Sequence, residues 1–139
     1  NYLRPRDLNF NLAVSNKNEV IDMYFQKNLS QLSTIEEKQA KKVFQGYIKK
    51  KKINALTLNS ILEKTKIDNL KIDLLDIDVE GADFKVLEGL SIIKYMPKLI
   101  CVEIHEKEIN ESVISKYLDN FKYELVWSGV FSHIFKSKA

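Results

Sequence analysis

The chain opens with two short stretches in which apolar and polar side chains alternate. Residues 9–15 alternate apolar with polar or small side chains, which is the period of a strand with one buried face. Residues 16–18 carry turn-forming side chains, and residues 20–25 have the composition of a second strand. The pattern therefore predicts an N-terminal β-hairpin.

From Ser33 onward the apolar residues recur at helical spacing. Ser33 and Thr34 each precede a glutamate by three positions, which gives two overlapping capping-box signals. The apolar residues that would share one helical face are Ala40, Val43, Phe44, Tyr47 and Ile48. The predicted helix ends in the lysines at 49–52, whose charges suit the negative end of a helix dipole. We expect a solvated helix end there and assign the lysine run no function.

The rest of the chain alternates between strand-like and helix-like segments. Strands are predicted at 53–56, 71–79, 98–104, 123–128 and 130–136, and helices after the N-cap Thr57, over 82–95 and over 112–121. Helix-length connections favour right-handed crossovers and a mostly parallel sheet. The last two strands, joined at Gly129, form a hairpin that adds an antiparallel edge.

Length and composition indicate one domain, or part of one, over residues 1–139. Hydrophobic residues make up 45% of the chain, enough for a single core, and a net charge of +3 spread along the sequence gives no argument for a nucleic-acid partner. No stretch has the length of a membrane span or a signal-peptide core, so no membrane partner is expected. Cys101 is the only cysteine. We expect it to pack as a small hydrophobe in a cytoplasmic protein.

The most informative segment is the acidic stretch at residues 72–83. In a strand, Asp76, Asp78 and Glu80 would project to one face, where burial without partners would cost several kcal/mol each. The strand must therefore surface near Asp78, and Gly81 allows a tight turn into the next helix. Ligands of open α/β sheets bind beyond the carboxyl ends of strands, which places Asp78 and Glu80 where a site would be.

These carboxylates could instead have a purely structural role. Asp78 could cap the following helix, with Glu80 only favouring the positive end of its dipole. Asp83 is expected in the first turn of that helix, and Asp73 is expected to be exposed at the start of the strand.

The next parallel strand ends in Glu103, followed by His105 and Glu106. Its carboxyl end should meet the same rim as Asp78, and a histidine there could act as a general base. The alternative for His105 is an exposed loop position. His133, in the last hairpin, is expected at the surface.

Several segments together resemble a known family. Residues 4–15, 56–62, 73–81 and 97–103 occur in the order and spacing typical of FkbM-like methyltransferases, and the resemblance covers nearly the whole chain. Its most specific part is Ile77-Asp78-Val79-Glu80-Gly81 together with the strand that runs from Pro97 to Glu103.

The resemblance implies a class I, Rossmann-like methyltransferase fold, with S-adenosylmethionine as methyl donor. It also implies an acceptor hydroxyl on a sugar or other small molecule. Asp78 and Glu80 match the family's acidic element after the fourth strand, and Glu103 matches its acid in the fifth. The candidate site is thus Asp78, Glu80 and His105 for catalysis, Glu103 and Glu106 for the substrate, and Asn9 and Asn11 for the cofactor, with no metal ligand.

One element implied by the resemblance is missing. Class I methyltransferases cradle the cofactor in a glycine-rich turn, whereas the four glycines here lie far apart, at 46, 81, 89 and 129. The match begins beyond that turn. We expect N-terminal truncation rather than decay, because a sheet without its first strands would expose apolar edges. A chain lacking the turn would be inactive alone.

Two other functions stay open at this point. Asp78, Glu80 and Glu103 could hold a hard cation in a metal-dependent transferase. The chain could also be a degenerate, non-catalytic binding module. The acceptor and the oligomeric state, including a homo-oligomer, are not determined by the sequence.

Overall fold

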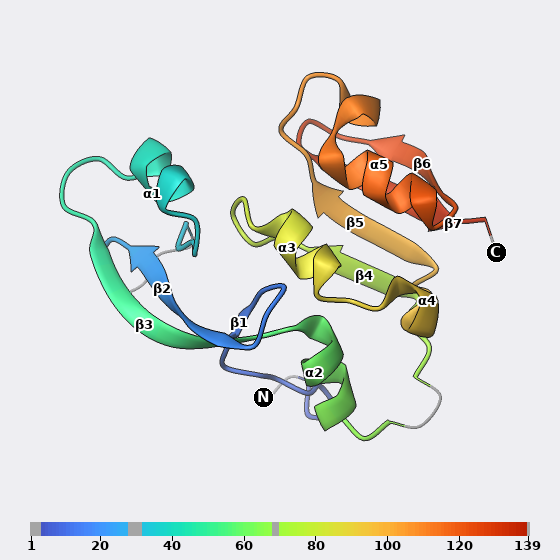
Figure 1. Cartoon of the computed structure of the whole chain (residues 1–139), viewed down its shortest axis with the longest axis horizontal. Helices are drawn as coiled ribbons and strands as arrows, with labels where there is room; N and C mark the ends of the chain where they lie inside the picture. Colours follow the sequence, from blue (N-terminus) through green and yellow to red (C-terminus); the bar gives the residue numbers. More distant parts are fainter. Residues whose placement is uncertain (1–3, 28–31, 68–69, 139) are drawn as a thin grey trace.

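The protein is described by a computed structural model covering residues 4–27, 32–67 and 70–138. It is an α/β structure with two mixed sheets, a three-stranded one in the N-terminal half and a four-stranded one in the C-terminal half (Figure 1). No helix in the described ranges has the length and apolar character needed to cross a membrane.

The first sheet has the order β1-β3-β2 and comprises β1 (Ala13–Val14), β2 (Glu19–Phe25) and β3 (Lys49–Leu56). β1 runs parallel to β3, and β2 runs antiparallel to it. The predicted N-terminal hairpin is therefore wrong, because β3 lies between the two strands that were expected to pair. The alternation of residue types identified both strands, but it carries no information on which partner each would find.

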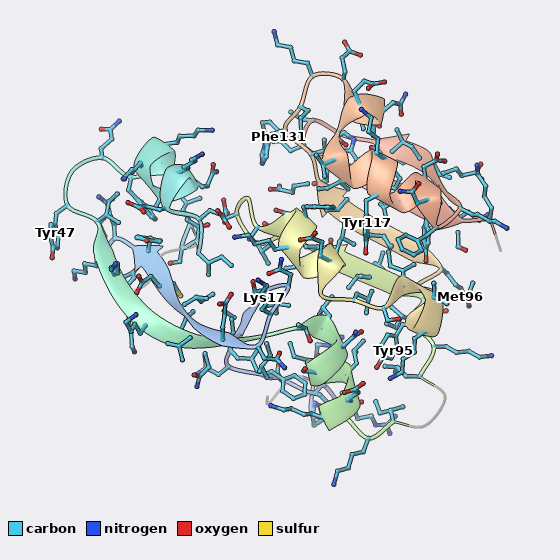
Figure 2. The ribbon with its side chains drawn as sticks, in the orientation of Figure 1. Lys17, Tyr47, Tyr95, Met96, Tyr117 and Phe131 are labelled. Atoms are coloured by element: carbon cyan, nitrogen blue, oxygen red, sulfur yellow. The ribbon has the colours of Figure 1, made fainter. Side chains whose placement is uncertain are left out.

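The predicted helix ends earlier than expected, and the lysine run is a strand. α1 spans Glu37–Val43; Phe44 has extended backbone angles, and Gly46 has a φ of +85°. Tyr47, in the bend before β3, is 83% exposed and points outward (Figure 2). The four lysines pair with β2 instead of ending a helix, and Asp22 on β2 forms ion pairs with two of them.

The second sheet has the order β4-β5-β7-β6, formed by β4 (Leu74–Ile77), β5 (Leu99–Glu103), β6 (Tyr123–Ser128) and β7 (Ser132–Ser137). β4 and β5 are parallel, and the other two pairings are antiparallel. The antiparallel C-terminal hairpin is confirmed. The expectation of a mostly parallel sheet is not, because the short loop at Gly129 returns the chain antiparallel within this sheet.

The remaining helices are short. They are α2 (Leu58–Lys64), α3 (Asp83–Glu88), α4 (Ile92–Tyr95), the 3-10 turn η1 (Ile109–Glu111) and α5 (Val113–Asn120). Thr57 caps α2 as predicted, accepting a hydrogen bond from the backbone N–H of Ser60. The predicted helix over 82–95 is divided into α3 and α4. Ile93 of α4 is 76% exposed, because the second helix starts in a new direction after Gly89.

One apolar cluster forms the core of the second sheet. α3, α4 and α5 lie on the same side of the sheet (Figure 1) and bury this face. Tyr117 of α5 meets Phe84 of α3 edge to face at 5.4 Å between ring centroids (Figure 2). The buried members of the cluster are Ile77, Val86, Leu87, Leu90, Ile92, Ile100, Val102, Ile104, Ile114, Leu118, Tyr123 and Phe135.

The expected surface position of His133 is wrong. Its side chain is 1% exposed and stands opposite Val102 of β5 and Ser128 of β6. Neither ring nitrogen has a hydrogen-bond partner among the described residues. The local sequence could not reveal this burial, because it arises from strands that flank β7 in the sheet.

Candidate functional site

The carboxyl ends of two neighbouring strands form the rim of the candidate site. β4 and β5 pair in parallel with Ile77 opposite Val102, so Asp78 follows one strand end while Glu103 completes the other. The predicted adjacency of these two strands is confirmed. The acidic stretch does leave the strand at Asp78, since β4 ends at Ile77.

A tight turn connects this rim to α3. Glu80 and Gly81 both have positive φ, at 52° and 90°, a conformation that glycine tolerates and that strains a residue with a side chain. The N-cap of α3 is Ala82, without a side-chain cap, so Asp78 does not cap the helix. Asp83 lies in the first turn as predicted and accepts a hydrogen bond from the Gly81 N–H at 3.2 Å.

Asp83 is a buried carboxyl behind this turn. It is 3% exposed, and its Oδ1 has no hydrogen-bond partner within the described part of the chain. Burial raises the pKa of Asp83, and the nearby Glu103 carboxylate adds to the increase.

A cavity of about 300 Å³ opens between the turn and the first sheet. Asp78 and Glu80 line it from the rim, and Thr34 and Ser33 line it from the segment before α1. β1, β2 and β3 contribute Ala13, Met23 and Ile53. The site is therefore a seam between the two sheets rather than a pocket within either one.

Thr34 connects the two walls of this cavity through hydrogen bonds. Its backbone pairs with Tyr24 of β2 through hydrogen bonds of 2.8 and 3.1 Å. Its hydroxyl donates to the Glu80 carbonyl at 2.8 Å and accepts from the Glu36 N–H at 3.0 Å. One buried side chain thus fixes the backbone of Glu80 relative to the first sheet.

The predicted acidic and imidazole groups lie close enough to influence one another. Desolvation raises the pKa of Glu80, and the charges of Asp78, Glu103 and Asp83 raise it further while His105 opposes them. His105 Nε2 lies 3.6 Å from Glu103 Oε2, and its ring lies 5.0 Å from that of Phe131. A carboxylate whose pKa is raised accepts a proton more readily near neutral pH.

The family assignment agrees with this geometry. The model of the methyltransferase FkbM domain matches residues 1–125 of the 139. This chain belongs to the FkbM methyltransferase family. Searches of curated proteins and of solved structures found no match. The matched region extends through the rim and the turn, whereas β7 and its buried His133 lie beyond it.

Other predicted site residues of this FkbM domain lie apart from the acidic cavity. Asn11 is exposed and lines a second, adjoining cavity. Asn9 and Glu106 are exposed and line neither cavity. Sequence reasoning missed Thr34 as a site residue, because its capping-box spacing explained it as a local helix signal; α1 begins after Glu36 instead.

Metal binding and a reactive cysteine thiol have less support at the rim. No group of three or more histidine, cysteine, aspartate or glutamate side chains in the described ranges is arranged to hold a metal ion, so Asp78, Glu80 and Glu103 do not form a ready ligand set. Desolvation and a hydrogen bond with Asp76 raise the pKa of the Cys101 thiol to about 11, which keeps it protonated at neutral pH.

Proposed function

We propose that this FkbM-family chain serves methyl transfer from S-adenosylmethionine to a hydroxyl group of a small molecule such as a sugar. We also propose that it does so within a class I, Rossmann-like arrangement, of which the parallel β4–β5 pair and the antiparallel β7 would be part. The observation that carries the proposal is the cavity that Asp78 and Glu80 line together at the carboxyl ends of the strands.

In this proposal Asp78 orients the acceptor hydroxyl and Glu80 accepts its proton. Asp78 is exposed at the rim and accepts a hydrogen bond from the acceptor hydroxyl, which orients its oxygen. Glu80, with its raised pKa, would take the proton that the acceptor hydroxyl loses when its oxygen displaces the methyl group from sulfur. The backbone of Glu80 is held by Thr34, so its carboxylate starts from a fixed position.

His105 and the residues around it complete the acceptor side of the site. His105 Nε2 lies 3.6 Å from Glu103 Oε2, and a neutral His105 is the second candidate for the proton acceptor. Glu106 follows on the exposed loop, where it would contact the outer part of the acceptor.

The chemistry of the residues fits the cationic part of the donor. When bound, S-adenosylmethionine supplies an electrophilic methyl group on a positively charged sulfur. Asp78 and Glu80 are negatively charged groups at one cavity and would attract that charge. Asn9 and Asn11 remain the predicted contacts to the polar rim of the cofactor. The described residues contain no glycine-rich turn for the adenosine half, since their glycines stand singly.

A methyl-transfer assay on a parent chain that includes the glycine-rich turn, with radiolabelled S-adenosylmethionine and a panel of sugars, tests the proposal. Asp78→Asn and Glu80→Gln should each lower kcat/KM by about 100-fold or more. Asp73→Asn is the matched control, because Asp73 is exposed at the opposite end of β4 and pairs only with Lys98 in the described structure.

The assay also separates the proposal from its rival. Turnover unchanged in Asp78→Asn and Glu80→Gln would remove both residues from the reaction. Absence of S-adenosylhomocysteine binding by calorimetry, together with absence of turnover, would favour a non-catalytic binding module instead.

A further inference from the structure

A second, larger cavity adjoins the acidic one where the first sheet is incomplete. β1 pairs with β3 at two positions only, with Ala13 opposite Ala55 and Val14 opposite Leu56. The chain just before β1 does not pair with β3, and a cavity of about 800 Å³ lies there. The two cavities share the lining residues Leu12, Ala13, Met23, Ser33 and Ile53. They therefore form one continuous groove along the edge of β3.

The two ends of this groove carry opposite charges. Asp78 and Glu80 line the first cavity, and no lysine or arginine is among its described lining residues. Lys51 and Lys52 line the second, with the amides of Asn11 and Asn54, and no carboxylate is among its described lining residues. A ligand that spans the groove thus meets an acidic end and a basic end.

Strand geometry and the lining of the second cavity together distinguish Lys51 from the other lysines of the run. Alternate side chains of a strand point to opposite faces. Lys50 and Lys52 share the face of Asp22 and lie 2.8 and 3.7 Å from its carboxylate oxygens. Lys51 stands opposite Met23, on the other face, and makes no ion pair within the described residues. Lys49 shares this face and, among the described residues, also has no ion pair with β2, but of the two only Lys51 lines the second cavity.

We propose that the acceptor carries an anionic oxygen group, a phosphate or a carboxylate, that binds Lys51 while the reacting hydroxyl lies at Asp78 and Glu80. This inference rests on the proposed function and adds the substrate class. The acidic end repels the anionic group and the basic end attracts it, so a molecule bearing both groups binds in one direction only. That orientation brings the hydroxyl to the base, and Lys51 contributes binding and direction rather than proton transfer.

Titration of the 15N-labelled chain with sugar ligands tests this inference without requiring turnover. The probes are glucose 6-phosphate, glucuronate and uncharged glucose, followed through the amide signals of Asn54 and Ser33. The charged probes should shift these signals saturably, and glucose should not. Comparing the phosphate with the carboxylate probe identifies which anionic group the groove takes.

Two variants of the same strand provide the decisive comparison. Lys51→Gln should weaken binding of the charged probe by about tenfold or more, whereas Lys50→Gln should change it by less than about twofold. Equal weakening in both variants, or no saturable shift with either charged probe, would overturn the inference.

A donor titration completes the test. In a parent chain that includes the glycine-rich turn, S-adenosylhomocysteine affinity should be the same with Lys51→Gln as without it; a selective loss would place the donor carboxylate at Lys51 and overturn the inference. Failure of the proposed function would appear differently, as intact binding of the charged probe without methyl transfer.

Discussion

The two halves of the molecule differ in how they are stabilised. All twelve buried members of the apolar cluster come from residues 77–135, and this half packs three helices on its sheet. In the first sheet the strands contribute one buried apolar side chain, Ala55, and β3 begins with four exposed lysines. The candidate site lies between them, so one of its walls is built on a core and the other on a sheet with little core of its own.

Polar contacts and close backbone packing hold the weaker wall against the stronger one. Lys85 of α3 pairs with Glu36 at 2.6 Å, and Thr34 donates to the Glu80 carbonyl. The chain after β1 passes so close to the end of α3 that a Cβ at Gly89 would lie 2.5 Å from the Ser15 carbonyl oxygen. Changes in these contacts should loosen the first sheet while the second keeps its structure.

The largest loss of stability is expected from a substitution in the core of the second half. Leu118→Ala removes a fully buried side chain of α5 and should lower the free energy of unfolding by about 3 kcal/mol. Because the first sheet depends on this support, both halves should lose amide-exchange protection together. Val113→Ala on the same helix is the control, since Val113 is 56% exposed and should cost less than about 0.5 kcal/mol. Denaturant melts measure both; a small loss in Leu118→Ala would contradict the assigned core.

A smaller and more local effect is expected at the seam. Gly89→Ala should cost about 2 kcal/mol, because the added methyl meets backbone and not a flexible side chain. Hydrogen exchange should show loss of protection in β1 and β3 with β5 and β7 largely unchanged. Gly89→Val should enlarge the difference. Uniform loss across both sheets would show that the halves unfold as one unit.

The sequence predicted the features that local signals encode. Thr57 as an N-cap, the surfacing of the acidic strand after Ile77 and the hairpin around Gly129 each depend on residues close together in the chain. The β4–β5 adjacency also followed, because strands linked by a helical connection usually lie side by side. These features position Asp78 and Glu103.

The features that depend on distant partners could not be predicted. The lysine run fits both a helix end and a strand, and only Asp22 on the paired β2 decides for the strand. His133 has polar and apolar neighbours in sequence, and its burial follows from β5 and β6 on either side. The cavity itself combines segments separated by 46 positions, such as Thr34 and Glu80.

The hydrogen bond between Thr34 and Glu80 allows a third test of how the two halves are connected. Thr34→Val keeps the shape but leaves the Glu80 carbonyl and the Glu36 N–H without the hydroxyl, which should cost about 1 kcal/mol. Thr34→Ser retains the hydroxyl and should stay close to the unmodified chain. In the methyl-transfer assay, Thr34→Val should lower kcat more than its loss of stability explains. Equal behaviour of the two variants would mean that the hydroxyl does not fix Glu80.

The smallest expected effect is a change in pH dependence at Asp83, on the stronger side of the seam. Burial raises the pKa of this carboxyl above its ordinary 3.8, so the folded state binds its proton more tightly than the unfolded state does. The resulting stabilisation is complete below pH 3.8 and is lost as the pH rises through the raised pKa. Asp83→Asn keeps an oxygen that can accept from the Gly81 N–H but does not titrate. Urea melts at a series of pH values should therefore show the variant gaining stability relative to the unmodified chain as the pH rises across this window. A constant difference between the two would mean that the Asp83 carboxyl is as well solvated in the folded state as in the unfolded one, and that the boundary between the two halves is open to water.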